Sequence, residues 1–552
     1  MYNACAGSLR YTLSINQRTM TRRDFINHTG AGYASLLAWG LLRPAPAEAF
    51  DLPANGRADD GKARKVLILG AGLAGLTTAY ELGKLGYDCT VLEARSRSGG
   101  RVWTVRGGTQ ETELGGPAQT CRFDDGHYFN GGAARIPHHH QLTLHYCREL
   151  NVPLEIFNGA NESAWLYNER SDAPGVATPG VATPDGLANR RMRISEYHAD
   201  MRGYTSELLA KALDQSALDE RLTKEDVEKL IDFLKNEGDL KTGHLYKGTN
   251  RRTYRTEPGA GATPGELTDP YGLTDLLRSG FMQPVFYNVG DYVYEQQATL
   301  LQPVGGMDAI PKALERKLTG KILFNAPVRE LRKTDTGVRV VYEKEGKPAE
   351  LTAEFCVCTL PLPVLKKLDS DLSGPVKRAA DFVPYIKTGK IGLQFKRRFW
   401  EEDDGIYGGI SRTNMDINQI WYPSFGFMGR KGVLIGYYNF YSRAEAVGNL
   451  SLAEREKLAL TQGGKIHPPY PQEFENSFSL AWHKIPHSEG GWALYDDAVR
   501  KKYYPALLEP DGNIYFAGEH TTYLTAWMAG AFASARRAVE AIHARVGQYT
   551  KK

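Results

Sequence analysis

Residues 65–94, "KVLILGAGLAGLTTAYELGKLGYDCTVLEA", have the pattern of a strand, a glycine turn, an amphipathic helix and a second strand. Gly70, Gly72 and Gly75 form a G-x-G-x-x-G motif after the first apolar run, and Glu93 ends the second strand. In such a unit the first glycine makes the turn, the second lets a pyrophosphate approach the helix N-terminus, and the third lets the helix pack on the strand. The acid would bind ribose hydroxyls. The segment therefore predicts an α/β fold with a dinucleotide site.

The composition is typical of a folded globular protein. Of the 552 residues, 42% are hydrophobic and 24% are charged, and the formal net charge is +4. A chain of this length has room for two or three domains. No dense lysine and arginine run lies on a helical pattern, so the charge indicates neither nucleic acid nor a membrane surface as a partner.

The first fifty residues resemble a twin-arginine signal peptide. "TRRDFI" at 21–26 precedes an apolar stretch at 31–42, and Ala-Glu-Ala at 47–49 fits a small-x-small cleavage site. The apolar stretch is shorter than the ~20 residues that a membrane-spanning helix needs, so we expect no stable membrane insertion. We expect residues 1–49 to be cleaved and the protein to be exported, to the periplasm or beyond. This route carries folded proteins, which suits a protein that binds its cofactor first.

The patterning of the rest of the chain alternates between two types. Strand-rich and glycine-turn segments at 64–150, 301–370 and 491–545 are interpreted as three parts of one nucleotide-binding domain. Helical patterning dominates 151–300, which we interpret as a helical and substrate subdomain. A β-rich segment, 371–490, is expected to form the substrate-binding domain.

One helix of the subdomain can be predicted in detail. Thr223 is placed to cap it, with Asp226 at the third helical position. Its apolar positions recur at helical spacing and form one stripe, namely Val227, Leu230, Ile231 and Leu234.

Two further motifs favour one kind of dinucleotide. "RSRSGGRVWT" follows the acid of the second strand, and "YFAGEHT" lies near the C-terminus. Together with the glycine turn they occur in the order found in the flavin-dependent amine oxidase family, which the chain resembles over most of 64–545. The resemblance implies FAD rather than NAD as the cofactor. It also implies an α/β fold with a Rossmann-like FAD-binding domain, a mixed-sheet substrate domain and a helical subdomain.

The resemblance implies which residues contact the cofactor. In the family an acid, x, Arg and then Gly-Gly-Arg form one part of the flavin site, and the acid of the C-terminal motif lies by the ribityl and pyrophosphate groups. The corresponding residues are Gly70, Gly72, Gly75, Glu93, Arg95, Gly99, Gly100, Arg101, Gly132, Ala133, Val328 and Glu519.

Lys390 is the candidate catalytic residue. It lies in "KTGKIGLQFKRRFW", a stretch of alternating character. From the residues alone, a lysine between apolar neighbours is usually a surface residue with a buried aliphatic stem. In the family the matching lysine binds flavin N5 through a water. The resemblance therefore implies that Lys390 holds this water and steers the chemistry of oxygen.

Tryptophans near the C-terminus are candidate walls of the substrate site. Trp527 follows the second flavin motif in "TAWMAGAF", and Trp492 lies in "EGGWALY". As bare sequence they would be core residues. The resemblance implies that they, with Ala526, flank the reacting carbon and nitrogen of the substrate above the flavin.

Arg135 in "GAARIP" is the residue that indicates which class of amine is the substrate. L-amino-acid oxidases have an arginine in a similar context, whereas amine oxidases that take uncharged-tail amines have none in this loop. A planar guanidinium binds a carboxylate through two parallel hydrogen bonds. The alternative is a salt bridge to a neighbouring acid of the protein. Tyr437 matches the tyrosine that donates a second hydrogen bond to the carboxylate, with the adjacent Tyr438 as the alternative.

Clusters of histidine and cysteine invite a metal interpretation, which we do not favour. Successive side chains of a helix diverge by about 100°, so His138, His139 and His140 cannot converge on one ion. We expect a solvated helix start after Pro137. Cys356 and Cys358, in "EFCVCTL", are two positions apart and would lie on one face of a buried strand. No other potential metal ligands are near them in the sequence.

The combined prediction is an exported FAD-dependent L-amino-acid oxidase. It would convert L-amino acids and oxygen into 2-oxo acids, ammonium and hydrogen peroxide. The alternatives are an amine oxidase acting on monoamines or polyamines, an amino-acid 2-monooxygenase and, from another class, a non-catalytic exported flavoprotein. We expect no nucleic-acid partner and a homo-oligomer, most simply a dimer.

Overall fold

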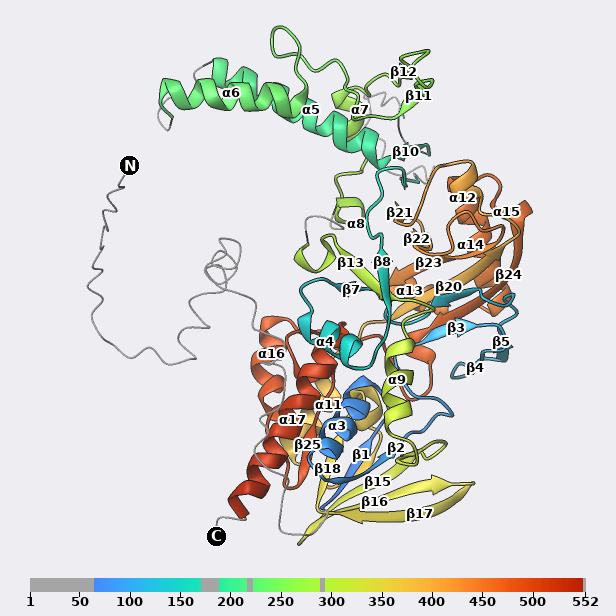
Figure 1. Ribbon diagram of the computed structural model, residues 1–552, viewed down its shortest axis with the longest axis vertical. Helices are drawn as coiled ribbons and strands as arrows, with labels where there is room; N and C mark the ends of the chain where they lie inside the picture. The colour runs from blue at the N-terminus through green and yellow to red at the C-terminus, as the bar shows by residue number, and fades with distance from the viewer. Residues whose placement is uncertain (1–63, 170–186, 188, 216–221, 288–292, 550–552) are drawn as a thin grey trace, which may run out of the picture. The chain divides into compact units, whose positions relative to one another are not determined.

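The computed structural model describes residues 64–169, 187, 189–215, 222–287 and 293–549 (Figure 1). The predicted signal peptide lies outside these residues. Among the described helices, none combines the length and apolar character needed to cross a membrane.

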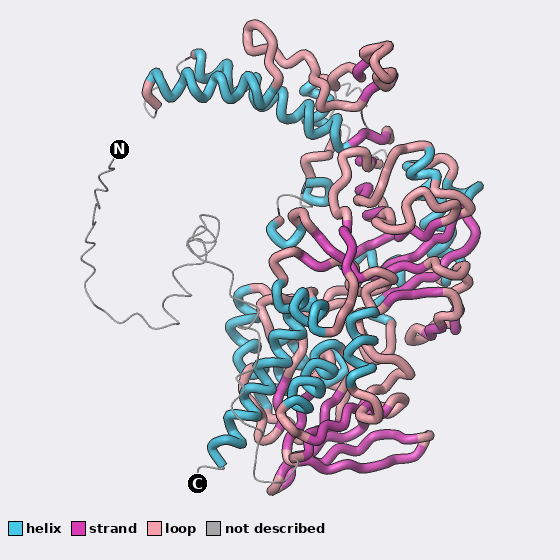
Figure 2. Tube along the Cα trace, in the orientation of Figure 1, coloured by secondary structure: helices cyan, strands magenta, loops and turns pink. Residues whose placement is uncertain are grey.

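A five-stranded parallel sheet forms the base of the fold. Its order is β14 (Ile322–Leu323), β2 (Asp88–Leu92), β1 (Lys65–Leu69), β18 (Phe355–Cys358) and β25 (Ile514–Phe516). Every neighbouring pair in it is parallel. The strands come from the first, middle and last parts of the chain, and Figures 1 and 2 show them side by side. This is the α/β fold that the sequence predicted.

Each face of this sheet is covered. On one face α3 (Leu73–Lys84) lies against α17 (Met528–Tyr549) (Figure 1). On the other face Leu67, Leu69, Cys356 and Cys358 share one apolar cluster with a mixed four-stranded sheet and two short helices. These elements are β15 (Val328–Thr334), β16 (Gly337–Lys344), β17 (Lys347–Ala353), β19 (Asp369–Ser370), α10 (Leu362–Leu365) and α11 (Gly374–Phe382). The five cysteines of the described chain are all buried free thiols, and its residues include no cluster that could hold a metal ion.

A mixed seven-stranded sheet is the second large sheet of the fold. Its order is β10 (Arg191–Arg193), β9 (Trp165–Tyr167), β21 (Ile410–Thr413), β22 (Gln419–Trp421), β23 (Gly432–Phe440), β20 (Thr388–Phe395) and β24 (Phe474–Ala481). All pairs are antiparallel except β9 with β21. In β20 every residue is buried, and Lys390 stands opposite Tyr438 of β23 and Leu480 of β24.

Smaller elements complete the fold. The short strands are β3 (Thr104–Arg106), β4 (Gln110–Thr112), β5 (Ala118–Thr120), β6 (Tyr128–Asn130), β7 (Ile136–Pro137), β8 (Leu154–Phe157) and β13 (Leu300–Pro303). The helices are α4 (Gln141–Glu149), α8 (Pro284–Tyr287), α9 (Ala309–Lys317), α12 (Phe399–Glu402), α13 (Tyr441–Gly448), α14 (Leu452–Ile466), α15 (Tyr470–Glu473) and α16 (Asp497–Tyr503). Since β8, β9 and β10 come from 151–300, that segment is less purely helical than its pattern indicated.

The helical part of 151–300 is built on α5 (Ile194–Asp214) and α6 (Lys224–Gly238). Thr223 caps α6, because its side chain accepts a hydrogen bond from the Asp226 N–H, as predicted. Of the predicted apolar stripe, Leu234 is buried, while the others are partly buried against Ala210 and Leu213 of α5. A hairpin of β11 (Tyr254–Thr256) and β12 (Glu266–Leu267), followed by α7 (Leu273–Arg278), completes this subdomain.

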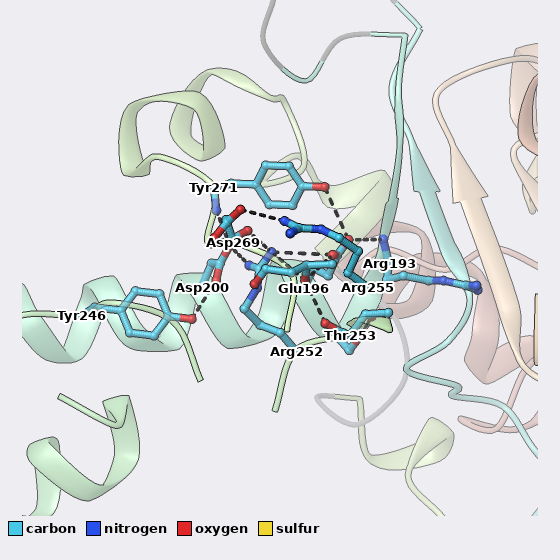
Figure 3. Close-up of polar contacts among 11 residues, drawn as sticks. Arg193, Glu196, Asp200, Tyr246, Arg252, Thr253, Arg255, Asp269 and Tyr271 are labelled. Carbon is cyan, nitrogen blue, oxygen red and sulfur yellow. Dashed lines mark hydrogen bonds and ion pairs between the residues drawn. The ribbon is translucent and has the colours of Figure 1, made fainter. Parts of the chain in front are cut away.

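A buried ion pair holds the hairpin segment to α5 (Figure 3). The Arg252 guanidinium contacts the Asp200 carboxylate, and both side chains have 0% exposure. Asp200 also accepts hydrogen bonds from the Tyr246 hydroxyl at 2.7 Å and the Tyr271 N–H at 2.8 Å. Arg252 further donates to the Asp269 carbonyl oxygen at 2.6 Å. Because a buried charge is costly without its partner, this network fixes the segment to the helix.

Replacing Arg252 by methionine should therefore loosen the helical subdomain. The change leaves the Asp200 carboxylate buried without a cation, at a cost of about 3–5 kcal/mol. Hydrogen exchange in α5 measures the loss of local stability. Arg255→Met is the matched control, since Arg255 pairs with Glu266 and Asp269 at the surface. Equal exchange in the two variants would contradict the assignment.

Candidate active site

A cavity of about 390 Å³ runs from the parallel sheet to the seven-stranded sheet. Its walls come from the first βα turn, the 93–101 segment, the end of β18, the strands β20 and β23, and the segments 487–492 and 518–531. It thus brings together the motifs that the sequence placed at opposite ends of the chain.

The glycine turn has the geometry that its pattern predicted. Gly70 has a φ of +100°, which favours glycine. A Cβ on Gly75 would lie 1.9 Å from the Gly70 carbonyl oxygen, so only glycine lets α3 pack this closely on the turn. Gly72 lines the cavity, and a Cβ on it would meet no atom within 4 Å. The space above Gly72 is thus open for a ligand.

Glu93 is fixed at the end of β2 by two backbone N–H groups. Its Oε2 accepts a hydrogen bond from Ala71 at 2.7 Å, and its Oε1 accepts one from Arg95 at 2.9 Å. The carboxylate therefore also closes the turn, a role that the sequence did not indicate. Glu93 lines the cavity, where its contact with a ribose stays a prediction.

Two arginines of the 93–101 segment bind distant parts of the chain. Arg95 donates to the Ser488 hydroxyl at 2.9 Å. Arg101 donates to the Gly491 carbonyl oxygen and to Glu519 Oε1, each at 2.8 Å. The other carboxylate oxygen of Glu519 is buried and has no hydrogen-bond partner in the described chain. A ligand hydroxyl or a water can satisfy this acceptor.

The cavity fits a flavin dinucleotide. The N-terminus of α3 has no side-chain cap, so its N–H groups and its dipole are available to a pyrophosphate. Gly72 leaves room for that approach, and Glu519 offers an acceptor to the ribityl region. Other predicted cofactor residues line the cavity as well, namely Gly70, Gly99, Gly100, Gly132, Ala133 and Val328.

Lys390 lies at the far end of this cavity and is 1% exposed. Its Nζ donates hydrogen bonds to the carbonyl oxygens of Asn130 at 3.0 Å and Gly132 at 2.7 Å. Burial, with a smaller contribution from the Arg135 charge, lowers the pKa of Lys390 to about 7. The surface alternative is therefore wrong, and the side chain can change charge near neutral pH.

The structure corrects the tyrosine assignment by one residue. Side chains of a strand alternate between its faces, and Tyr438, directly opposite Lys390, shares the cavity face with it. The Lys390 Nζ lies 4.4 Å from the Tyr438 ring centroid. Tyr437 is 1% exposed, points to the opposite side and belongs to the core of the seven-stranded sheet. We therefore transfer the predicted role from Tyr437 to Tyr438.

Arg135 has no ion pair among the residues that the structure describes, which contradicts the salt-bridge alternative. Its guanidinium carbon lies 4.8 Å from the Trp421 ring centroid and 5.7 Å from that of Trp527. Its Nε is buried without a hydrogen-bond partner in the described chain. Burial lowers the pKa of Arg135 to about 10, and the nearby Tyr438 partly opposes this shift. The guanidinium is thus held between aromatic rings with its hydrogen-bonding capacity unused.

The predicted wall residues Trp492, Ala526 and Trp527 line the cavity. Two tryptophans that the sequence analysis missed also contact the site. Trp421 packs on Arg135, and Trp482 lines the cavity. Neither lies in a motif, and only the pairing of β22, β23, β20 and β24 brings them to this face.

The prediction of a solvated histidine run is wrong for one of its members. His138 is exposed, but His140 is 5% exposed and packs edge-on against Trp527, with ring centroids 5.0 Å apart. Burial lowers the pKa of His140 to about 4. The reason is tertiary, because Trp527 comes from the other end of the chain.

Comparisons with known proteins identify the family of this chain. The model of the family described as flavin containing amine oxidoreductase matches residues 73–543. A protein of Bacillus subtilis (strain 168) named as a candidate L-amino-acid oxidase, YobN, is 28% identical over 88% of this chain and 95% of its own. The L-amino-acid oxidase BmooLAAO-I of Bothrops moojeni is 26% identical over 90% of this chain and 92% of its own.

Solved structures share the fold at low identity. A variant of putrescine oxidase matches with a TM-score of 0.56 and 18% identity, covering 88% of this chain and 99% of its own. Cyclohexylamine oxidase from Brevibacterium oxydans IH-35A matches with a TM-score of 0.55 and 17% identity, covering 89% of this chain and 100% of its own. At these identities the match supports the fold alone.

Gly72→Val should yield a folded protein without bound flavin. The backbone at Gly72 is extended, with a φ of −71°, so valine fits it, but the branched side chain fills the open space of the cavity. Flavin absorbance per protein measures the loss. Gly83→Val is the matched control, because Gly83 is an exposed position of α3 that also has open space. Full flavin content in Gly72→Val would refute the placement of the pyrophosphate.

Proposed function

The chain belongs to the flavin containing amine oxidoreductase family, and we propose that within it the protein is an FAD-dependent L-amino-acid oxidase. The proposed reaction converts an L-amino acid, oxygen and water into a 2-oxo acid, ammonium and hydrogen peroxide. FAD is the cofactor of this enzyme, and its site is the cavity that begins at the glycine turn.

The observation that carries the proposal is the positive charge beside the cavity: Lys390 lines it, and Arg135, which does not, packs on its wall residue Trp527. Arg135 and Lys390 lie close enough for the charge of one to lower the pKa of the other. No described carboxylate pairs with either of them. The acids that line the cavity are engaged elsewhere, Glu519 by Arg101, Glu489 by Lys367 and Glu93 by backbone N–H groups. A buried cation without an internal partner favours an anionic ligand.

An amino-acid carboxylate provides that anion. A guanidinium donates two parallel hydrogen bonds to it, and the Tyr438 hydroxyl, close enough to Arg135 to interact with its charge, would donate a third. With the carboxylate held there, Trp492 and Trp527 would limit the directions in which the amine and the α-hydrogen can point. Orientation of this kind supplies much of the rate in such a site, which is consistent with the lack of an evident general base among the described residues of this end.

Lys390 contributes a donor at the reacting end. FAD, when bound, would supply the redox chemistry, namely the two-electron oxidation of the amino acid and the reduction of oxygen to hydrogen peroxide. A protonated Lys390 stabilises negative charge that develops on oxygen and can hold a water at that place. Water then hydrolyses the released imino acid to the 2-oxo acid and ammonium.

The relatives support the amino-acid substrate, and the fold neighbours define its rival. Proteins named as L-amino-acid oxidases match at 26–28% identity, whereas the solved structures are oxidases of putrescine and cyclohexylamine. An amine oxidase would oxidise the decarboxylated amine better than the amino acid. An amino-acid 2-monooxygenase would release less peroxide than the oxygen it consumes, and a non-catalytic flavoprotein would keep its flavin oxidised with all amino acids.

We also propose that the enzyme is exported. The twin-arginine motif at 21–26 and the cleavage pattern at 47–49 support this proposal. Release of hydrogen peroxide outside the cytoplasm would spare the cell its product. Cell fractionation, with N-terminal sequencing of the mature chain, tests it.

Arg135→Ala should lower kcat/KM for amino acids by roughly 10²–10⁴-fold, because it removes two charge-assisted hydrogen bonds. The decarboxylated amine never uses the guanidinium, so the ratio of kcat/KM for amino acid over amine should fall by the same factor. Arg148→Ala, at an exposed position of α4, is the control.

The lysine variant separates charge from geometry. Arg135→Lys keeps the charge but loses the planar fork, so it should recover only part of the lost kcat/KM. Equal losses on amino acid and amine in Arg135→Ala would instead show that Arg135 supports the fold or the flavin site, and would remove the main support for an amino-acid substrate.

Lys390→Met should retain FAD and slow the reoxidation of the reduced enzyme. In the unmodified protein the rate should fall as the pH rises through about 7, where Lys390 loses its proton. The variant should be slow on both sides of this pKa. Stopped-flow mixing with oxygen measures both, with Lys387→Met, an exposed lysine paired with Glu445, as the control. Unchanged reoxidation in Lys390→Met would exclude this role.

A further inference from the structure

The position of Arg135 is set by its backbone rather than by its side chain. No hydrogen bond from the guanidinium to another described residue fixes it, and the rings of Trp421 and Trp527 confine it only by packing. A side chain of this length has several rotatable bonds, so its placement depends on where the preceding loop puts its Cα. The loop at 130–135 therefore controls the geometry of the proposed carboxylate site.

Three consecutive carbonyl oxygens of this loop are bound by two side chains. The Lys390 Nζ donates to the carbonyl oxygens of Asn130 at 3.0 Å and Gly132 at 2.7 Å. Between them, the Trp482 Nε1 donates to the carbonyl oxygen of Gly131 at 2.9 Å. Both donors are nearly fully buried, at 1% and 3% exposure. Buried carbonyls held in this way cannot shift without losing a hydrogen bond in a water-poor place.

Close packing confines the loop further. A Cβ on Gly131 would lie 2.6 Å from Leu480 Cδ1, and one on Gly132 would lie 1.8 Å from the Arg101 carbonyl oxygen. The Ala133 N–H donates to that same oxygen at 3.3 Å. The loop is thus pressed between the flavin motif on one side and the donors of Lys390 and Trp482 on the other.

We propose that Trp482 and Lys390 act as a carbonyl clamp on the loop at 130–132, and that Trp482 is a positioning residue for recognition of the substrate carboxylate through Arg135. Lys390 then has two roles, because it lines the cofactor cavity and also binds the loop that carries Arg135. The proposal rests on the proposed function, because it presumes a carboxylate on Arg135. Its gain is preorganisation, since a fixed guanidinium loses less freedom when the substrate binds.

The test removes the Trp482 N–H and keeps most of its apolar contacts. Trp482→Phe should lower the ratio of kcat/KM for amino acid over decarboxylated amine by about fivefold, the effect expected for one lost hydrogen bond. The loss should appear mainly in KM for the amino acid, with the flavin content retained. A wall residue without a positioning role would change both substrates alike, and that result would overturn the proposal.

Trp400→Phe is the matched control. Its indole N–H is buried without a partner in the described chain, and it lies in the core of the seven-stranded sheet rather than at the cavity. The substrate ratio should not change in it. A ratio that falls equally in Trp400→Phe would show that loss of core packing, rather than of the Gly131 hydrogen bond, is responsible.

A double variant separates the clamp from the proposed function. If Trp482 acts through Arg135, Trp482→Phe should not lower the substrate ratio further in an Arg135→Ala background. An unchanged ratio in Arg135→Ala alone would defeat the proposed function. A lowered ratio there, together with an unchanged ratio in Trp482→Phe, would defeat only the clamp.

Lys390, the other residue of the clamp, provides a second test if Trp482→Phe does not fold. Under anaerobic conditions Lys390→Met removes the donors to Asn130 and Gly132 without involving oxygen. Flavin reduction by the amino acid should then require a higher substrate concentration, while reduction by the amine should show a smaller change. Equal shifts for the two substrates would overturn the clamp.

Discussion

The ion pair between Arg101 and Glu519 joins residues 418 positions apart, and the site depends on it. Arg101 belongs to the segment that follows the first βαβ unit, and Glu519 lies in the short turn between β25 and α17. The Arg101 side chain also binds the Gly491 carbonyl oxygen, and its backbone supports Gly132 and Ala133. Three segments therefore meet at Arg101: its own flavin motif, the loop at 130–135 and the C-terminal motif around Glu519. They are far apart in the sequence and are made at different times during synthesis.

The two ends of the cavity differ in how their charges are balanced. At the cofactor end Arg101 pairs with the Glu519 carboxylate, and a helix N-terminus supplies partial positive charge. At the substrate end, Arg135 and Lys390 face only aromatic rings and backbone carbonyls among the described residues. Such a division would suit the proposed oxidase, in which the cofactor stays bound while a charged substrate enters and leaves with each turnover.

Local features could be predicted from the sequence, and features that depend on pairing could not. The roles of Gly70 and Gly75 and the cap of α6 follow from neighbouring residues. Tyr437 and Tyr438 point to opposite faces of their strand, and only the pairing with Lys390 shows which of them faces the cavity. In the same way, the burial of His140 depends on Trp527, which is distant in sequence. The hydrogen bond of Trp482 to Gly131 joins residues that are 351 positions apart.

The buried cysteines have a chemical consequence for the proposed oxidase, whose product would be an oxidant. Burial raises the pKa of the described thiols, to about 11 for Cys121 and about 12 for Cys89, Cys147 and Cys358. Peroxide attacks the thiolate and not the thiol, so these sulfur atoms are unreactive at neutral pH. The five described cysteines form no disulfide, and burial shields their thiols from the hydrogen peroxide that the proposed reaction would release.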